Sequence, residues 1–197
     1  MKIGIVSVQG AFIEHEKMLA SLGAECVELR KKEDIERNEI SAIVLPGGES
    51  TVQGKLLREL GMFGPIKRLI ESGVPVLATC AGMILLAQHI SGDGTVHFGT
   101  LPVTVRRNAY GRQLGSFVRK GNVGGIGEFE MAFIRAPFVE ETESRDVDVL
   151  SEVDGRIVAV RFKNQLALAF HPEIGEDTRI HELFLAMIEQ SARRKAG

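Results

Sequence analysis

The sequence contains no tryptophan, one tyrosine and only two cysteines, Cys26 and Cys80, among 197 residues. Two cysteines far apart in the chain argue against a disulfide framework, and a domain of this length can build its core without one. Cations are not in excess either, because 24 Lys and Arg stand against 26 Asp and Glu. We therefore expect one domain over residues 1–197 in a reducing compartment, with no nucleic acid and no membrane as partner.

Long apolar runs are missing as well. No stretch approaches the length that crosses a bilayer, and the N-terminal run MKIGIVSVQG meets polar residues from Gln9 onward, too early for a signal peptide. We interpret this run as a first strand and expect a cytoplasmic protein. The histidines, cysteines and carboxylates also lack metal-ligand spacing, so the sequence predicts neither a metal nor another cofactor.

Short apolar runs alternate with helix-period segments over the first part of the chain, which indicates βα units and a mostly parallel sheet flanked by helices. The strands and helices expected here are 3–8, 12–21, 42–45, 51–60, 65–72 and 74–79. The second part is β-rich and predicts an additional mixed or antiparallel portion. Its expected elements are strands 101–107, 114–119, 129–134, 156–162 and 166–170, and a final helix over 178–192. The fold class is therefore α/β.

The segment VPVLATCAGMILLAQHI, residues 74–90, is typical of a buried strand, a tight turn over 79–82 and an apolar helix. A cysteine at such a turn sits over the unpaired N–H groups of the helix, which favour thiolate over thiol. A small residue such as Gly82 also lets the backbone approach a substrate. Cys80 is thus a candidate nucleophile, and the alternative is a small, inert, buried side chain.

A cysteine nucleophile needs a base, and the base needs a group that orients it. The segment LALAFHPEIGED offers both, because His171 and Glu173 lie two residues apart in extended chain and face the same side. Pro172 between them stiffens that geometry. Glu173 can then bind one imidazole nitrogen while the other faces the thiol. The alternative for this His-Pro-Glu segment is a capped strand end without catalysis.

In a third segment, AIVLPGGESTV, a buried strand ends at two consecutive glycines before a helix. Gly47 and Gly48 let backbone N–H groups converge on one point, as an oxyanion hole requires. The alternatives are phosphate binding by the same amides and a purely structural turn.

The sequence gives weaker evidence for a functional role of the remaining candidate residues. Cys26 lies in an expected strand and is interpreted as buried rather than reactive. Arg107 and Arg135 stand at or near strand ends, where either can hold a substrate carboxylate through a bidentate contact, and a surface arginine is the alternative. Four further histidines lack an evident carboxylate or strand context: His15, His89, His97 and His181.

Together these segments resemble the class I, triad-type glutamine amidotransferases, and among them the family of glutaminase subunits of pyridoxal 5′-phosphate synthases. The resemblance spans nearly the whole chain. Its markers are VQGAFIEH at 8–15, LPGGEST at 45–51, TCAGMILLA at 79–87, RRNAYGRQLGSF at 106–117, FIRAP at 133–137 and FHPE at 170–173. The cysteine turn and His-Pro-Glu identify only the superfamily. The first, fourth and fifth markers single out this family.

The resemblance implies a flavodoxin-like fold and hydrolysis of L-glutamine to L-glutamate and ammonia. It implies that Cys80 attacks the side-chain amide, that His171 passes a proton to the departing ammonia, and that Glu173 orients His171. Water then hydrolyses the glutamyl thioester. The implied glutamine-binding residues are Gly47, Gly48, Glu49, Arg107, Ile134 and Arg135, with a Gly47–Gly48 amide in the oxyanion hole.

The same resemblance implies a partner. Gln9 and Gly10 would lie near the interface with the synthase, or lyase, subunit, which receives the ammonia through a channel. Complexes of the family contain twelve copies of each subunit. We expect the free glutaminase to be nearly inactive, because docking can complete an oxyanion hole built on flexible glycines.

One position departs from the family pattern. The turn around the cysteine commonly reads G-x-C-x-G in these enzymes, and the first glycine is Ala78 here. A residue with a Cβ tolerates positive φ poorly, so activity would suffer if the backbone at this position required it.

Three other interpretations stay open from the sequence. A glutaminase serving another synthase, such as the one that makes imidazole glycerol phosphate, agrees less well with FIRAP and RNAYGRQ. A flavodoxin-like module that binds phosphate at PGGES would leave Cys80 inert. A redox-sensing or peptidase-like relative would use the same cysteine turn on other substrates.

Overall fold

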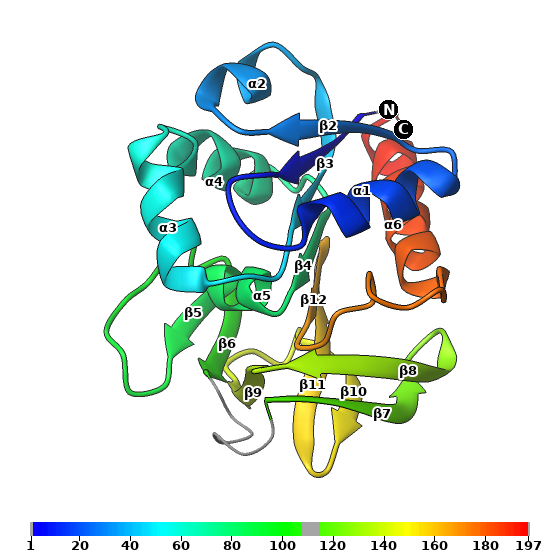
Figure 1. Ribbon diagram of the computed structural model, residues 1–197. Helices are drawn as coiled ribbons and strands as arrows, with labels where there is room; N and C mark the ends of the chain where they lie inside the picture. The colour runs from blue at the N-terminus through cyan, green and yellow to red at the C-terminus, as the bar shows by residue number, and fades with distance from the viewer. Residues whose placement is uncertain (1, 108–114, 197) are drawn as a thin grey trace.

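The computed structural model describes residues 2–107 and 115–196. In chain order the elements are β1 (Lys2–Val6), α1 (Phe12–Ser21), β2 (Glu25–Leu29), α2 (Lys32–Glu36), β3 (Ile40–Leu45), α3 (Ser50–Glu59), α4 (Phe63–Glu71), β4 (Val76–Thr79), α5 (Ala81–Leu86), β5 (Ala87–Ile90), β6 (Leu101–Arg106), β7 (Ser116–Val123), β8 (Gly127–Ile134), β9 (Phe138–Thr142), β10 (Asp148–Val153), β11 (Arg156–Phe162), β12 (Gln165–Leu168) and α6 (Arg179–Ala196). Helices α1 and α6 cover one face of the central sheet, and α3, α4 and α5 cover the other (Figure 1). No described helix has the length and apolar character needed to span a membrane.

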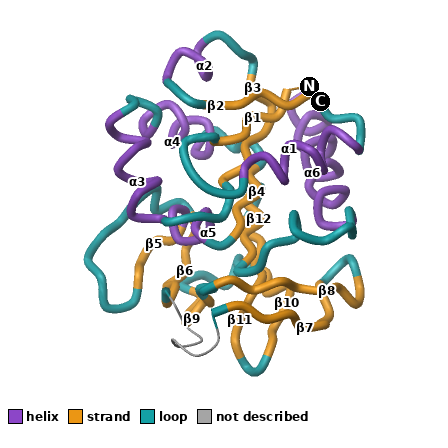
Figure 2. Tube along the Cα trace, in the orientation of Figure 1, coloured by secondary structure: helices purple, strands orange, loops and turns teal. Residues whose placement is uncertain are grey.

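Ten of the described strands form one sheet in the order β2-β1-β3-β4-β12-β11-β9-β6-β5, with β10 paired to β11. The strands from β2 to β12 run parallel, and β11 turns back antiparallel to β12. Strands β7 and β8 form a separate antiparallel pair. Figure 2 shows the strands as a column between the helices, with β7 and β8 at one end. The predicted fold class, a mostly parallel sheet flanked by helices with an additional antiparallel portion, is confirmed.

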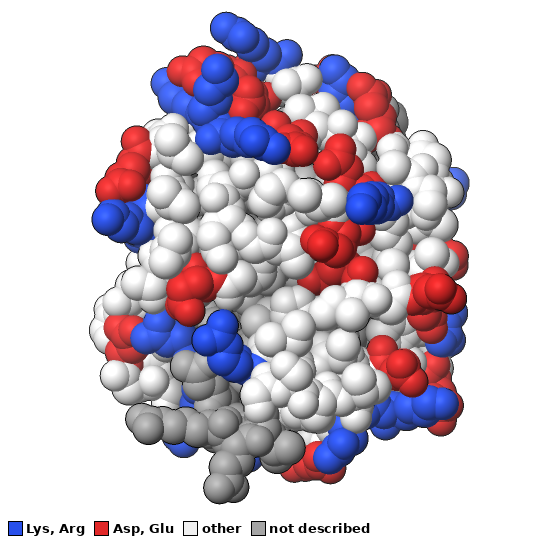
Figure 3. All heavy atoms as spheres, viewed as in Figure 1, with Lys and Arg blue, Asp and Glu red and all other residues white. Residues whose placement is uncertain are grey.

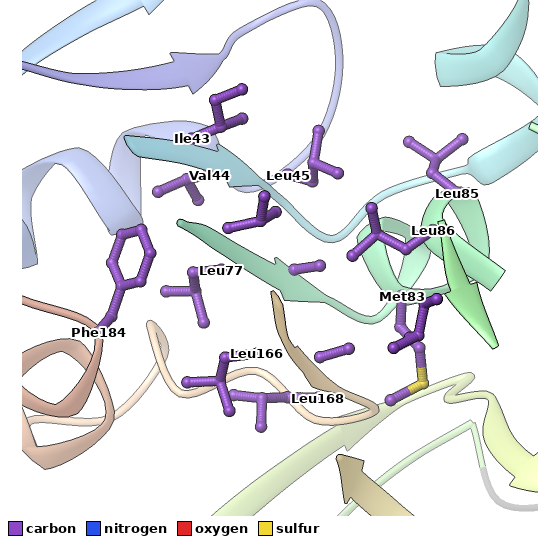
Figure 4. Close-up of a cluster of buried hydrophobic side chains, with 14 of the residues drawn as sticks. Ile43, Val44, Leu45, Leu77, Met83, Leu85, Leu86, Leu166, Leu168 and Phe184 are labelled. Carbon is purple, nitrogen blue, oxygen red and sulfur yellow. The ribbon is translucent and has the colours of Figure 1, made fainter. Parts of the chain in front are cut away.

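The parallel strands are buried on both faces, as their continuous apolar sequences predict. Side chains of β3, β4 and β12, such as Ile43, Leu77 and Leu166, have no exposed surface. Phe184 of α6 packs on one side of these strands and Met83 of α5 lies on the other (Figure 4). This core fixes the carboxyl ends of three neighbouring parallel strands at one edge of the sheet, where open α/β sheets bind their ligands.

Most expected elements lie where the sequence places them, including the turn between β11 and β12. One expectation was wrong: the apolar helix after Cys80 ends at Leu86, and residues 87–90 form strand β5. The reason is tertiary, because β5 pairs in parallel with β6, whose partner residues begin at Leu101. Strands β9 and β10 were not predicted. The central part of the RRNAYGRQLGSF marker, residues 108–114, lies outside the described residues.

Candidate active site

Cys80 follows β4 directly and stands at the N-terminal end of α5, with φ 48° and ψ −102°. A non-glycine residue reaches this conformation only when its surroundings hold it there. A hydrogen bond from the Cys80 N–H to the carbonyl oxygen of Leu168, at 2.7 Å, stabilises this conformation. Gly82 allows α5 to lie close to β3, because a Cβ there would lie 2.1 Å from the Leu45 carbonyl oxygen. The close approach of α5 to β3 therefore depends on this glycine.

Ala78 raises no conflict with this turn. It lies inside β4, where it pairs with Leu45 of β3 and Ala167 of β12, and it is fully buried. The positive φ that a Cβ resists is adopted by Cys80 itself and not by Ala78. Alanine at this position is thus compatible with the turn that presents the thiol.

His171 and Glu173 come from the loop after β12, and both are buried. The His171 N–H donates to the Ala132 carbonyl oxygen at 2.8 Å, which ties the loop to β8. Nδ1 of His171 lies 2.7 Å from Oε1 of Glu173, as the His-x-Glu spacing predicts. Gly47 backs the imidazole so closely that a Cβ there would lie 2.3 Å from Cε1 of His171. The ring is held between a carboxylate and a backbone surface that admits no side chain.

Burial alone would lower the pKa of His171, but the interactions with Cys80 and Glu173 outweigh it and raise this pKa to about 10. Burial likewise opposes ionisation of Glu173, yet His15 and His171 hold the pKa of this carboxyl below its ordinary value. The imidazole is therefore a strong proton acceptor beside an ionised carboxylate. It can take the thiol proton and pass it to a leaving group.

The loop at Gln9 is hydrogen-bonded to the loop at Gly47 and packs closely against it. The Ala11 N–H donates to the Gly47 carbonyl oxygen at 3.0 Å, and the Glu49 N–H donates to Oε1 of Gln9 at 2.8 Å. Gly10, at φ 102°, approaches so closely that a Cβ there would lie 1.9 Å from the Gly47 oxygen. In a trans peptide the N–H points opposite to the C=O, so the Gly48 N–H is directed away from Ala11.

A cavity of about 340 Å³ opens at this edge of the sheet. Every site residue predicted from the sequence lines it except Glu173, which lies behind His171. The lining residues are Gln9, Gly10, Ala11, Gly47, Gly48, Glu49, Ser50, Cys80, Ile84, Arg107, Ile134, Arg135 and His171. Ala11, Ser50 and Ile84 were not predicted, although each lies within or beside a quoted marker. The volume is at the small end of the range for small-molecule sites.

Polar groups of several kinds gather at the cavity. The Arg107 guanidinium is held by the Asp93 carboxylate and by the Thr51 hydroxyl. The Cys80 thiol donates a weak hydrogen bond to the Ile134 carbonyl oxygen at 3.8 Å, and Arg135 has φ 43°. Acidic and basic side chains are interspersed over the face of the molecule that Figure 3 shows. Within residues 2–107 and 115–196, no group of three His, Cys, Asp or Glu side chains is placed to hold a metal ion.

The structure changes the interpretation of two histidines. His15 is fully buried, with Nε2 3.4 Å from Oε2 of Glu173, so the view that it lacks a carboxylate was wrong. His89 was also said to lack a carboxylate, but its Nδ1 lies 2.8 Å from Oε1 of Glu143 on the surface. Helical periodicity carried a signal for His15, since it shares the buried face of α1 with Leu19, four residues on.

Cys26 lies in β2, as expected, and is half-buried rather than fully buried. Burial, with a smaller contribution from Glu16, raises the pKa of its thiol to about 11. The side chain therefore stays a protonated thiol at neutral pH. This agrees with the interpretation of Cys26 as unreactive.

Acid is expected to destabilise the protein partly through His181. Burial and the neighbouring His15 lower the pKa of His181 to about 3, against the attraction of Glu173. In the unfolded chain this histidine has an ordinary pKa near 6.5 and binds a proton that it does not bind in the folded protein. Its contribution to the free energy of unfolding is therefore fully present above about pH 6.5 and is lost as the pH falls toward 3. One such group contributes a slope of about 1.4 kcal/mol per pH unit.

The measurement is the free energy of unfolding in urea at several pH values between 7 and 4. His181→Gln keeps a donor toward His15 without titrating, so its stability should fall less steeply with acid than that of the wild type. Equal slopes for wild type and His181→Gln would contradict the assignment.

Comparison with known proteins identifies the family that the chain resembles. The family described as the SNO glutamine amidotransferase family matches residues 5–190. A curated relative, pyridoxal 5′-phosphate synthase subunit PdxT of Desulfitobacterium hafniense, is 56% identical over 95% of this chain and 94% of the relative. The protein of the same name from Methanocorpusculum labreanum is 52% identical over 95% of this chain and 98% of its own length.

The structural comparison agrees. A solved crystal structure of a glutamine amidotransferase superposes with a TM-score of 0.88 at 41% sequence identity, covering 95% of this chain and 98% of the other.

Proposed function

The chain belongs to the SNO glutamine amidotransferase family, and from that premise we propose that it is the glutaminase subunit of a pyridoxal 5′-phosphate synthase, with Cys80, His171 and Glu173 as its catalytic triad. One observation carries the assignment of the triad. The thiol and the imidazole face one small cavity, and the imidazole is fixed from behind by a buried carboxylate at 2.7 Å.

The reaction begins with the thiol proton on His171, which the raised pKa of this imidazole favours. The sulfur of Cys80 attacks the amide carbon of the glutamine side chain, and a tetrahedral intermediate forms. Its collapse breaks the C–N bond while His171 gives its proton to the leaving nitrogen, so ammonia departs and a glutamyl thioester remains. His171, now neutral, takes a proton from water, which hydrolyses the thioester to glutamate. Glu173 keeps Nδ1 of His171 as the donor throughout.

The cavity offers complementary charges for an amino acid. Arg107 and Arg135 line it and can hold the α-carboxylate of glutamine, while Glu49 can hold the α-ammonium. The backbone oxygen of Ile134 faces the thiol and adds a polar wall. Asp93 already pairs with Arg107, which keeps this guanidinium oriented at the mouth of the cavity.

Gly47 and Gly48 are proposed to stabilise the oxyanion. The Gly47 carbonyl oxygen accepts from the Ala11 N–H, so the N–H of the same peptide, that of Gly48, is directed away from Ala11 and is the proposed donor. Gln9 and Gly10, which hold this loop, are proposed to lie at the interface with the synthase subunit. A partner that shifts them would move the Gly47–Gly48 peptide directly.

The synthase subunit is the proposed acceptor of ammonia, through a channel, in a complex of twelve copies of each subunit. The relatives named as subunits of that synthase support the partnership. A cytoplasmic location is proposed with it.

The test is the release of glutamate from L-glutamine by the purified protein, with and without the synthase subunit. The wild type should be nearly inactive alone and should gain at least about tenfold in kcat with the partner, because the partner completes the site. Full activity without the partner would contradict the dependence on docking. No glutamate in either state would contradict the proposed function itself.

A further inference from the structure

Two buried histidines lie behind the proposed triad. His15 of α1 and His181 of α6 are both 0% exposed, although they are 166 positions apart in the sequence. Nδ1 of His15 and Nε2 of His181 are 2.9 Å apart. On its other side, Nε2 of His15 lies 3.1 Å from the Thr79 hydroxyl and 3.4 Å from Oε2 of Glu173. His15 therefore touches the residue before the nucleophile and the residue that orients the base.

Unpaired atoms decide which nitrogens of this cluster carry protons. In the part of the chain that the structure describes, Oε2 of Glu173 and Nδ1 of His181 are buried without a hydrogen-bond partner. If His15 donated from Nδ1 to His181, a buried N–H on His181 would be orphaned, and a lone pair of His15 would face the carboxylate. Orphaned buried N–H groups are rarer than unpaired acceptors.

The opposite tautomers avoid both penalties. Nε2–H of His181 donates to Nδ1 of His15, and Nε2–H of His15 is directed at the Thr79 hydroxyl, with Oε2 of Glu173 beside it at 3.4 Å. Both atoms of the cluster that stay unpaired, Nδ1 of His181 and Oε2 of Glu173, are then acceptors. Burial lowers the pKa of both histidines, so His15 acts on the carboxylate as a neutral donor and not as a cation. His171 serves Oε1 of Glu173, and His15 faces Oε2.

We propose that His15 is a positioning residue for glutamine hydrolysis: oriented by His181, its Nε2–H fixes the second oxygen of Glu173 and thereby the rotation of the carboxylate that holds His171. A carboxylate anchored through one oxygen can rotate, and rotation would release Nδ1 of His171. Groups that orient metal-ligating side chains in this way typically change activity by about 10- to 100-fold when removed, and we expect a loss of this order here. The inference rests on the proposed glutaminase function.

The test compares two substitutions of equal length in the complex with the synthase subunit. His15→Gln places an amide N–H near the position of Nε2, whereas His15→Met fills the same space without a donor. The Met variant should lose about 10- to 100-fold in kcat with KM changed less than about twofold, because His15 does not touch the substrate. The Gln variant should recover to within about threefold of the wild type.

A second readout separates positioning from packing. Without the His15 donor the ionised form of Glu173 is less favoured, so the acid limb of the pH–rate profile should move to higher pH in the Met variant and stay in place in the Gln variant. Thermal unfolding checks that both proteins fold. If the Met variant does not fold, His15→Asn takes its place, because its shorter amide can reach His181 but not Glu173.

Equal activity of the Gln and Met variants, whether high or low, would overturn the positioning role, since the donor would then be irrelevant. A wild-type complex that releases no glutamate would overturn the proposed function and this inference together. The two failures are therefore distinguishable.

Discussion

Replacing Cys80 by alanine is expected to lower the rate of glutamine hydrolysis in the complex by about four orders of magnitude or more, while the protein stays folded. The loss is large because the substitution removes the sulfur that is proposed to form the thioester, and no other described nucleophile lines the cavity with a base beside it. Folding should survive, since alanine is no worse than cysteine at φ 48° and the thiol makes only a weak contact with Ile134.

The matched control is Cys26→Ala, which removes the other thiol of the chain. Its pKa is raised to about 11, so it does not compete as a nucleophile at neutral pH, and activity should be unchanged. Glutamate release and thermal unfolding are measured on both variants. Activity of Cys80→Ala above about 1% of wild type, or loss of activity in Cys26→Ala, would contradict the role given to Cys80.

His171→Ala is expected to lower kcat by about three to four orders of magnitude, because both the proton donor and the base of the reaction are lost. It should also destabilise the fold by about 1–3 kcal/mol, since Glu173 loses its 2.7 Å partner and stays buried. Steady-state glutamate release and urea unfolding measure the two effects.

A surface pair supplies the control for His171. His89 and Glu143 make the same type of contact at 2.8 Å, but the His89 side chain is 60% exposed against 7% for His171. His89→Ala should leave kcat unchanged and should alter stability by less than about 1 kcal/mol, as for exposed pairs. Similar effects of the two substitutions would show that the His171–Glu173 pair has no special part in the chemistry.

The parts of the fold that follow from local pattern could be predicted from the sequence. Continuous apolar runs marked β1, β3 and β4 because both faces of a parallel sheet are covered. The place of Cys80 at a strand-to-helix turn could equally be predicted, and so could the contact between His171 and Glu173, which are two residues apart on one side of the chain. These contacts depend on short-range geometry that the sequence displays.

Long-range contacts could not be predicted from the sequence in the same way. Strand β5 interrupts an apolar segment that looks helical, because pairing with β6 outweighs local preference. The His15–His181 contact joins α1 to α6 across 166 positions. Nothing in the sequence of either helix indicates that it packs against the other. The departure at Ala78 could not be judged from the motif, because the position of the positive φ within the turn is a property of the folded backbone.

The most direct measurement is mass spectrometry of the complex quenched in acid during turnover of L-glutamine. The account predicts a glutamyl group on the peptide that contains Cys80, present with the synthase subunit and missing from Cys80→Ala. A glutamyl group on another peptide, or glutamate release with no labelled intermediate under conditions that preserve thioesters, would contradict covalent catalysis by Cys80.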